Sequence, residues 1–192
     1  ILWDVYYTHL GVWGFNQKYL LGIQLYNLPI EEILFFICIP YACAFSYHCL
    51  NTLVPKDYFG PYQRVLSSML ILFLIIIGCL FAAKLYTAVA FFSLAILIIY
   101  LELFAKVVWL GRFYFAYLVL LLPFTIVNGI LTGTGLKEPI VWYNPNEFMG
   151  YRYLTIPFED IFYGMLLVLA SITLYERSKE RKVKRTHHRT TF

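Results

Sequence analysis

The chain has 192 residues, of which 61% are hydrophobic and only 14% are charged, and its mean hydropathy is +0.70. A soluble domain is roughly half apolar and a quarter charged, so this composition excludes an ordinary water-soluble protein and indicates one embedded in lipid. The net charge of +4 comes mostly from a basic C-terminal stretch beside an apolar segment. Such a stretch is typical of a topology signal or a contact to anionic lipid, and it does not indicate nucleic-acid binding.

Runs of about 20 mostly apolar residues predict membrane-spanning helices. Residues 1–10 look like the end of one such span. Further along the chain, the predicted spans are 33–50, 65–83, 85–104, 113–131 and 156–175, with Pro40 and Pro123 inside two of them. The sequence therefore predicts an all-α, polytopic helical membrane bundle.

Lysine and arginine residues set the expected orientation, because they are enriched in cytoplasmic loops. If the C-terminal tail is cytoplasmic, alternating spans place eleven of the fifteen basic residues on the cytoplasmic side. The four on the other side are Lys18, Lys84, Lys137 and Arg152. The loops 11–28 and 132–155 are then expected to face outward.

An internal repeat connects these two outward loops. Residues 16–33 align without a gap to residues 144–161 at an offset of 128. The matched pairs include Asn16 and Asn144, Gly22 and Gly150, Pro29 and Pro157, Glu31 and Glu159, and Glu32 and Asp160. Just upstream, an offset of 124 pairs Asp4 with Asn128. Two ordered matches at helix–loop junctions favour a duplication.

The repeat predicts two parallel three-helix units related by a pseudo-two-fold axis along the membrane normal. The expected divisions are a first unit at 1–55, a linker helix at 56–84, a second unit at 85–177 and a basic cytoplasmic tail at 178–192. If the units are equal, the first lacks one to two spans before Ile1. The expected total is then about seven spans, at about 20 residues each.

The doubled acidic motif is the candidate site. Only fifteen residues separate Asp160 from Glu176, too few to cross the hydrocarbon layer, so the acids should enter the apolar layer. Pro29 and Pro157 suit a first helical turn, where an acid also complements the helix dipole. Capping explains one acid per helix but not two neighbouring acids in both copies. Glu31 facing Glu159 is the first-ranked acid/base centre, followed by Glu32 and Asp160, with Asp4 and Asn128 orienting them.

The segments Trp3–Asp4, 11–16 and 27–32, together with 156–160, resemble the membrane-type lycopene cyclases. These occur in bacteria as two small subunits or one fused chain, and in fungi as a domain of a bifunctional phytoene synthase. The resemblance implies that each ψ-end of lycopene is converted to a β-ring, through γ-carotene to β-carotene. It also implies that the two Pro-x-Glu-Glu/Asp motifs form the active site. They match here at Pro29, Glu31, Glu32, Pro157, Glu159 and Asp160.

The implied chemistry agrees with buried carboxyl groups. Protonating an alkene requires an undissociated acid in a dry pocket, and the resulting cation is stabilised by carboxylates and aromatic faces. The aromatic candidates are Trp3, Trp13, Phe35 and Tyr151. The reaction is an isomerisation that consumes no electrons, so no cofactor is expected, and the four scattered cysteines indicate no metal site.

The expected partners are lycopene, other acyclic carotenoids and the lipid of a bacterial inner membrane. A homo-oligomer or an association with other carotenoid enzymes stays open. A proton-coupled transporter is the main alternative, since internal repeats and intramembrane carboxylates are also its signature. Its acids would usually lie at the centre of the spans, whereas these lie near one face. Another membrane terpene cyclase and a non-catalytic carotenoid-binding protein are the remaining alternatives.

Overall fold

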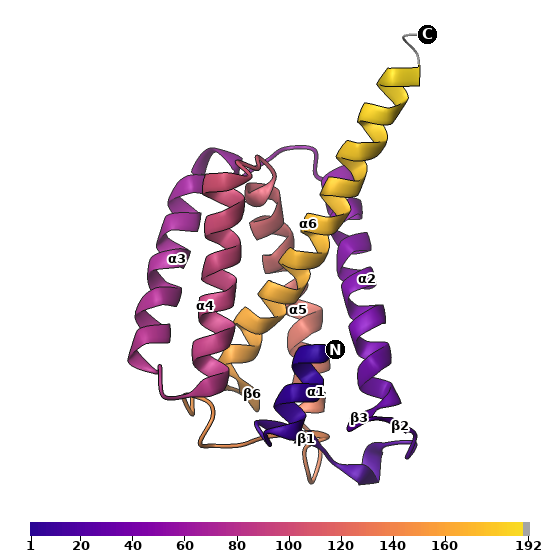
Figure 1. Ribbon diagram of the computed structural model, residues 1–192, viewed down its shortest axis with the longest axis vertical. Coiled ribbons are helices and arrows are strands. Elements are labelled where there is room, and N and C mark those ends of the chain that lie inside the picture. Colours follow the sequence, from indigo (N-terminus) through magenta and orange to yellow (C-terminus); the bar gives the residue numbers. More distant parts are fainter. Residues whose placement is uncertain (190–192) are drawn as a thin grey trace.

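The computed structural model describes the backbone of residues 1–189 and the side chains of residues 1–181. In this part of the chain, α-helices and three short antiparallel strand pairs follow one another (Figure 1). The helices are α1 (Leu2–His9), α2 (Ile30–Leu53), α3 (Gln63–Leu80), α4 (Leu85–Ile99), α5 (Leu110–Leu131) and α6 (Phe158–Arg189). The strands are β1 (Trp13–Phe15), β2 (Gln24–Leu25), β3 (Leu28–Pro29), β4 (Val141–Tyr143), β5 (Arg152–Tyr153) and β6 (Ile156–Pro157). Short 3₁₀ turns cover Gln17–Tyr19 and Gly60–Tyr62, and a π-helical turn, Tyr100–Phe104, extends α4.

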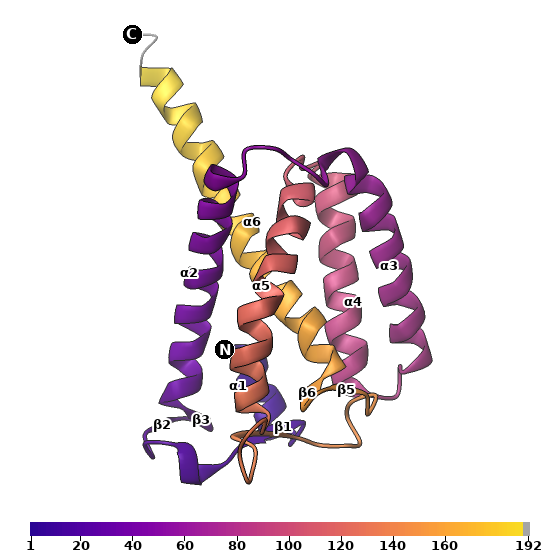
Figure 2. The ribbon, with the colours of Figure 1, turned by 180° about the vertical axis from the view of Figure 1, so that it is seen from behind.

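Five helices, α2 to α6, are long and apolar enough to cross a membrane. They coincide with the five complete spans predicted from hydropathy, and the all-α membrane fold is thereby confirmed. Pro40 lies inside α2 and Pro123 inside α5, as predicted. Helix α1 is a short segment that lies beside the lower half of the bundle (Figures 1 and 2).

The core of the bundle is centred on α4, which packs between α3 and α6. Its buried face includes Ala90, Phe91, Leu94 and Ile98. Helix α2 stands on the other side, against α5 and α6 (Figure 2). Tyr47 is the one buried residue in α2, all of which the structure describes. Apolar side chains can remain uncovered there because lipid is as apolar as they are.

The strands and their loops gather at one end of the bundle, which we call the hairpin side (Figure 1). Two hairpins, β2–β3 and β5–β6, lead directly into α2 and α6. Their tips contain non-glycine residues with positive φ, Tyr26 at 58° and Leu154 at 57°. These residues are 128 apart, as are the paired strands. The aligned segments therefore share one local structure.

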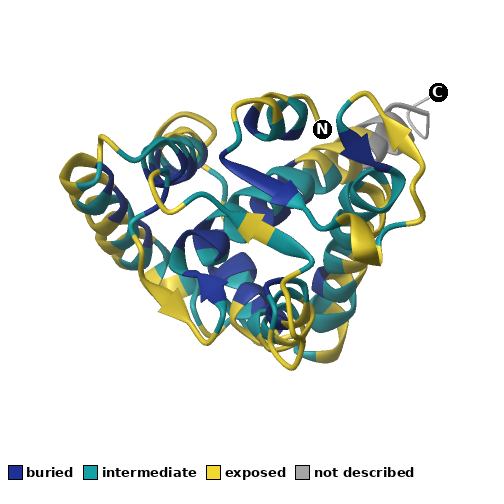
Figure 3. Cartoon of the chain, turned by 90° about the horizontal axis from the view of Figure 1, so that it is seen from below, coloured by how far each residue is buried: buried dark blue, intermediate teal, exposed yellow. Residues whose placement is uncertain are grey.

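The strand pair β1–β4 joins the two halves immediately before the aligned segments. Gly14 lies opposite Trp142, its counterpart at the offset of 128. The flanking hydrogen bonds also come in a matched pair: Asn16 N–H donates to the Ile140 carbonyl and Asn144 N–H to the Val12 carbonyl, each at 2.8 Å. Figure 3, seen from the hairpin side, shows the buried β1 beside β4 in the middle of the bundle. This is the arrangement expected at a pseudo-two-fold axis.

The division into units at 1–55, 56–84 and 85–177 stays a prediction. In the predicted basic tail, 178–192, the side chains after residue 181 lie outside the described residues.

The axis position itself provides a first prediction. A Cβ added at Gly14 would lie 2.3 Å from the Cζ2 atom of Trp142. We expect Gly14→Ala to lower the stability by about 1 kcal/mol, at the low end of overpacking costs, because the indole is 45% exposed and can move. Thermal unfolding in detergent measures this effect. Trp142→Ala should remove most of the penalty, and an equal loss in that background would exclude the clash as its cause.

Candidate active site

A cavity of about 260 Å³ lies between α2, α5 and α6 and reaches the hairpin side. Along α2 its lining runs from Glu32 to Ser46, which is about 20 Å at 1.5 Å per helical residue. The cavity is partly open, and its lining includes the exposed residues Ala42 on α2 and Pro123 and Val127 on α5. It is therefore an elongated space rather than a closed pocket.

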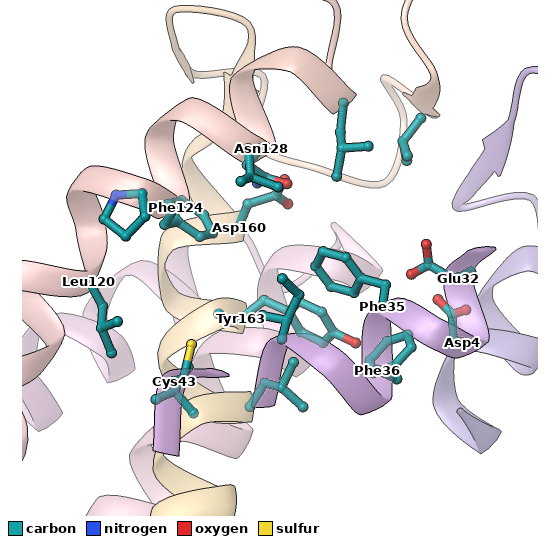
Figure 4. A pocket seen from close by; sticks show the side chains of 18 of the residues that line it. Asp4, Glu32, Phe35, Phe36, Cys43, Leu120, Phe124, Asn128, Asp160 and Tyr163 are labelled. Atoms are coloured by element: carbon teal, nitrogen blue, oxygen red, sulfur yellow. The ribbon is translucent and has the colours of Figure 1, made fainter. Parts of the chain in front are cut away.

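The polar groups are concentrated at the hairpin-side end of this cavity. Three carboxyl groups line it there, Asp4 from α1, Glu32 from α2 and Asp160 from α6. Figure 4 shows Asp4 beside Glu32 and Asn128 beside Asp160. The rest of the lining is mostly apolar, with Phe35, Phe36, Ile39, Leu120, Phe124, Leu167 and Val168 among its members. The carboxyl groups therefore lie at one end of a cavity whose walls are mostly apolar.

Asp160 is buried and accepts three hydrogen bonds. Tyr86 Oη donates to its Oδ1 at 2.5 Å, and Tyr143 Oη and Asn128 Nδ2 donate to its Oδ2 at 2.8 and 2.9 Å. Tyr143 lies at the end of β4, outside the spans, where burial first and the neighbouring Asp160 second raise its pKa well above the ordinary range. Its phenol therefore keeps its proton and remains a donor. Three donors around one carboxyl group stabilise the carboxylate form.

Asp4 and Glu32 form a different environment. Trp13 Nε1 donates to Asp4 Oδ1 at 3.0 Å, whereas the buried Oδ2 has no hydrogen-bond partner among the described residues. Asp4 and Glu32 lie side by side at the same end of the cavity (Figure 4). Two carboxyl groups that interact in a low-dielectric site do not both ionise readily.

The first-ranked pair, Glu31 and Glu159, lies outside the cavity lining. Each Oε1 accepts a backbone N–H at 2.7 Å, from Leu21 to Glu31 and from Met149 to Glu159. Glu159 is fully buried and also accepts the Thr87 hydroxyl at 2.5 Å. The two bonds are again 128 residues apart, and each fastens a hairpin loop to the start of a helix. Their catalytic role stays a prediction.

Pro29 and Pro157 lie one residue before the helices, not inside their first turns. Pro29 is the N-cap of α2, with an extended ψ of 150°. Both prolines close a hairpin, pairing with Gln24 and Arg152 respectively. They direct the chain from hairpin to helix, so that the acids that follow occupy the first turn, as predicted.

The aromatic candidates separate into two groups. Trp13 and Phe35 line the cavity, whereas Trp3 stacks on Tyr7 at a centroid distance of 4.9 Å outside the lining. Tyr151 is 68% exposed and also lies outside it. Tyr86, Tyr143 and Tyr163 line the cavity and were not singled out from the sequence. Tyr143 and Tyr163 are the offset-128 counterparts of Phe15 and Phe35, a signal that could have identified them.

The lining itself follows the repeat. Seven pairs of counterparts face the same cavity: Asp4 and Asn128, Trp13 and Val141, Phe15 and Tyr143, Glu32 and Asp160, Phe35 and Tyr163, Phe36 and Gly164, and Ile39 and Leu167. The first pair is 124 apart and the others 128. The cavity therefore lies between the two halves, close to their pseudo-two-fold axis. Among the described residues, no three His, Cys, Asp or Glu side chains are grouped so that they could hold a metal ion.

Comparison with known proteins agrees with this site. A family model described as lycopene cyclase matches residues 1–50 and 83–178, which include every residue that lines the cavity. The unmatched stretch between them, 51–82, contains α3. No curated protein and no solved structure matches the chain. Because the family model covers most of the sequence, the chain belongs to the lycopene cyclase family.

Proposed function

We propose that this membrane-embedded carotenoid cyclase converts the ψ-ends of lycopene to β-rings, through γ-carotene to β-carotene, by proton-initiated ring closure in the cavity. The observation that carries the proposal is the placement of Asp4, Glu32 and Asp160 at one end of an elongated, mostly apolar space. Carboxyl groups inside a membrane protein are costly and mark functional sites. Here they meet the kind of cavity that a long hydrocarbon needs.

The cavity size suits one end of the substrate. A protein cavity of roughly 150 Å³ holds benzene, so about 260 Å³ accommodates a ring and part of its chain but not a whole C40 polyene. The remaining chain would leave through the open side near Pro123 and Val127. Because these residues belong to a membrane-spanning part of α5, the opening faces lipid, where lycopene is dissolved.

The reaction needs a proton donor and a proton acceptor. A carboxylic acid protonates the terminal double bond, and the next double bond attacks the tertiary cation to close the ring. A carboxylate then removes a ring proton, so that no electrons are gained or lost. We therefore expect no cofactor. Glu32 and Asp160 are the acid/base groups in this proposal, and Glu31 and Glu159 position them by fixing the hairpin loops.

The cation formed on ring closure needs stabilisation. The side chains of Trp13, Phe35 and Tyr163 line the cavity, and Trp13 donates a hydrogen bond to Asp4. Aromatic faces attract cations by about 2 kcal/mol when water is excluded. We assign these three side chains to cation stabilisation and leave Trp3 and Tyr151 out of the site. We also propose a bacterial inner-membrane location with the hairpin side outward and the basic tail in the cytoplasm.

Expression in lycopene-accumulating bacteria tests the proposal. The pigments should change from red to orange, with γ- and then β-carotene separated by chromatography. Detection of the chain in the membrane fraction is the control for expression. Unchanged lycopene beside abundant, folded protein would contradict the activity, and ε-rings would contradict the β-type product. The transporter alternative would instead show lycopene-independent proton movement in proteoliposomes.

A further inference from the structure

The two halves of the cavity are related by the repeat but differ in chemistry where the carboxyl groups lie. Each half places a polar residue of one helix beside the acid that opens the next. In the first half this pair is Asp4 with Glu32, and in the second it is Asn128 with Asp160 (Figure 4). One carboxyl group in the first half is thus an amide in the second.

In the second half, every hydrogen bond to the acid favours its anion. Asn128 Nδ2 and the hydroxyls of Tyr86 and Tyr143 donate to Asp160 at 2.5–2.9 Å. A carboxylate that accepts several hydrogen bonds is stabilised in its charged form. Asp160 is therefore held as a carboxylate, the form in which it can accept a proton.

In the first half, the corresponding donors are missing. Phe15 stands where the second half has Tyr143, and Asp4 stands where it has Asn128. Trp13 donates to Asp4, and the other oxygen of Asp4 is buried without a partner among the described residues. Two adjacent carboxyl groups in an apolar site do not both ionise, because charging both is costly. This half therefore retains a proton.

We propose that the Asp4–Glu32 pair is the acid and Asp160 the base of the cyclisation, an assignment that rests on the proposed function. The proton on Glu32 passes to the inner carbon of the terminal double bond, leaving a tertiary cation on the outer carbon and a Glu32–Asp4 pair with one more negative charge. A carbon–carbon bond closes the ring, and Asp160 takes a ring proton as the new double bond forms. One turnover thus moves a proton from the first half to the second, and its return through solvent resets the site. Asp4 acts through Glu32 and is a positioning residue.

A substrate with a more basic end distinguishes the two roles. Cyclisation of lycopene 1,2-epoxide needs only a weak acid, because the epoxide oxygen is protonated instead of a carbon. The epoxide C–O bond then breaks as the ring closes, and the product carries a 2-hydroxyl group on the ring. Purified protein is assayed with both substrates. Glu32→Gln and Asp4→Asn should each lower lycopene conversion about 100-fold or more, while epoxide conversion stays within about 10-fold of the unmodified chain. Asp160→Asn should lose both activities, because proton removal is required from either substrate.

Phe15→Tyr is a further test that leaves all the carboxyl groups in place. Its phenol would supply the donor that Tyr143 supplies in the other half, favour the Glu32 anion and lower lycopene conversion about 10-fold, with the epoxide spared. If the epoxide rescued Asp160→Asn instead of the two first-half variants, the roles would be reversed. If it rescued none of them, or if Asp4→Asn and Phe15→Tyr had no effect, the assignment would be wrong. Failure of the unmodified chain on lycopene would instead refute the proposed function.

Discussion

Asp160→Asn should reduce the conversion of lycopene by about 1,000-fold while leaving the membrane protein folded. Removing a general base costs typically 10²- to 10⁴-fold. The substitution keeps the shape of the side chain and one acceptor oxygen for the hydroxyls of Tyr86 and Tyr143, which can also rotate to accept from the new amide. The loss should therefore be chemical rather than structural. Pigment analysis over time in lycopene-accumulating cells measures it.

Tyr86→Phe is the matched control, because it removes one donor to Asp160 and keeps the carboxyl group. We expect a loss of about 10-fold, consistent with one hydrogen bond of roughly 1.5 kcal/mol to a charged group. An Asp160→Asn chain with near-normal β-carotene formation would remove Asp160 from the chemistry and leave it a structural role at the centre of the tyrosine pair.

Glu159→Ala should lower the free energy of unfolding by about 2–4 kcal/mol, whereas Glu159→Gln should be nearly neutral. Alanine leaves the buried Met149 N–H and the Thr87 hydroxyl without their acceptor, and each unsatisfied group costs about 1–3 kcal/mol. Glutamine keeps the Oε1 atom that accepts both bonds. Thermal unfolding in detergent measures the difference, and cyclase activity is followed in parallel.

The same two variants decide whether Glu159 takes part in acid/base chemistry or only holds the hairpin loop in place. A fastening role predicts that the glutamine chain retains most of its activity, since a carbonyl oxygen is sufficient for the two hydrogen bonds. A stable glutamine chain with no activity would restore Glu159 to the acid/base centre, where the sequence alone ranked it. Glu31→Gln repeats the test in the other half through the Leu21 N–H.

The spans could be predicted from the sequence because hydrocarbon-length apolar runs have few alternatives. The predicted run 65–83 corresponds to α3 at Gln63–Leu80, and 113–131 corresponds to α5 at Leu110–Leu131. The strand pairs could not be predicted, because strands of two or three residues have no measurable alternation. The pairing of β1 with β4 also depends on contacts between segments more than 100 residues apart.

Which acid of each motif faces the cavity was also beyond the sequence. Neighbouring helical residues point about 100° apart, so one of Glu31 and Glu32 must turn away from any given target. Helix α2 is apolar on all sides, and its sequence therefore gives no inner face. The choice is made by the hairpin loop, whose Leu21 N–H binds Glu31 and leaves Glu32 for the cavity. Tyr86, on α4, has no counterpart in the described first half, so the repeat could not identify it as a cavity residue.

The Gly14–Trp142 contact limits how the two halves can be recombined. Consider two copies of residues 85–177 related by a true two-fold axis and paired through their β4 strands. Position 142 of one copy would then lie opposite position 142 of the other. Two indole rings would meet where one indole now covers a glycine. A symmetric homodimer of second halves would therefore have to displace at least one indole from the axis, and a small residue at position 142 in one copy should favour its assembly. The asymmetry of the enzyme is thus present at its axis as well as in its acids.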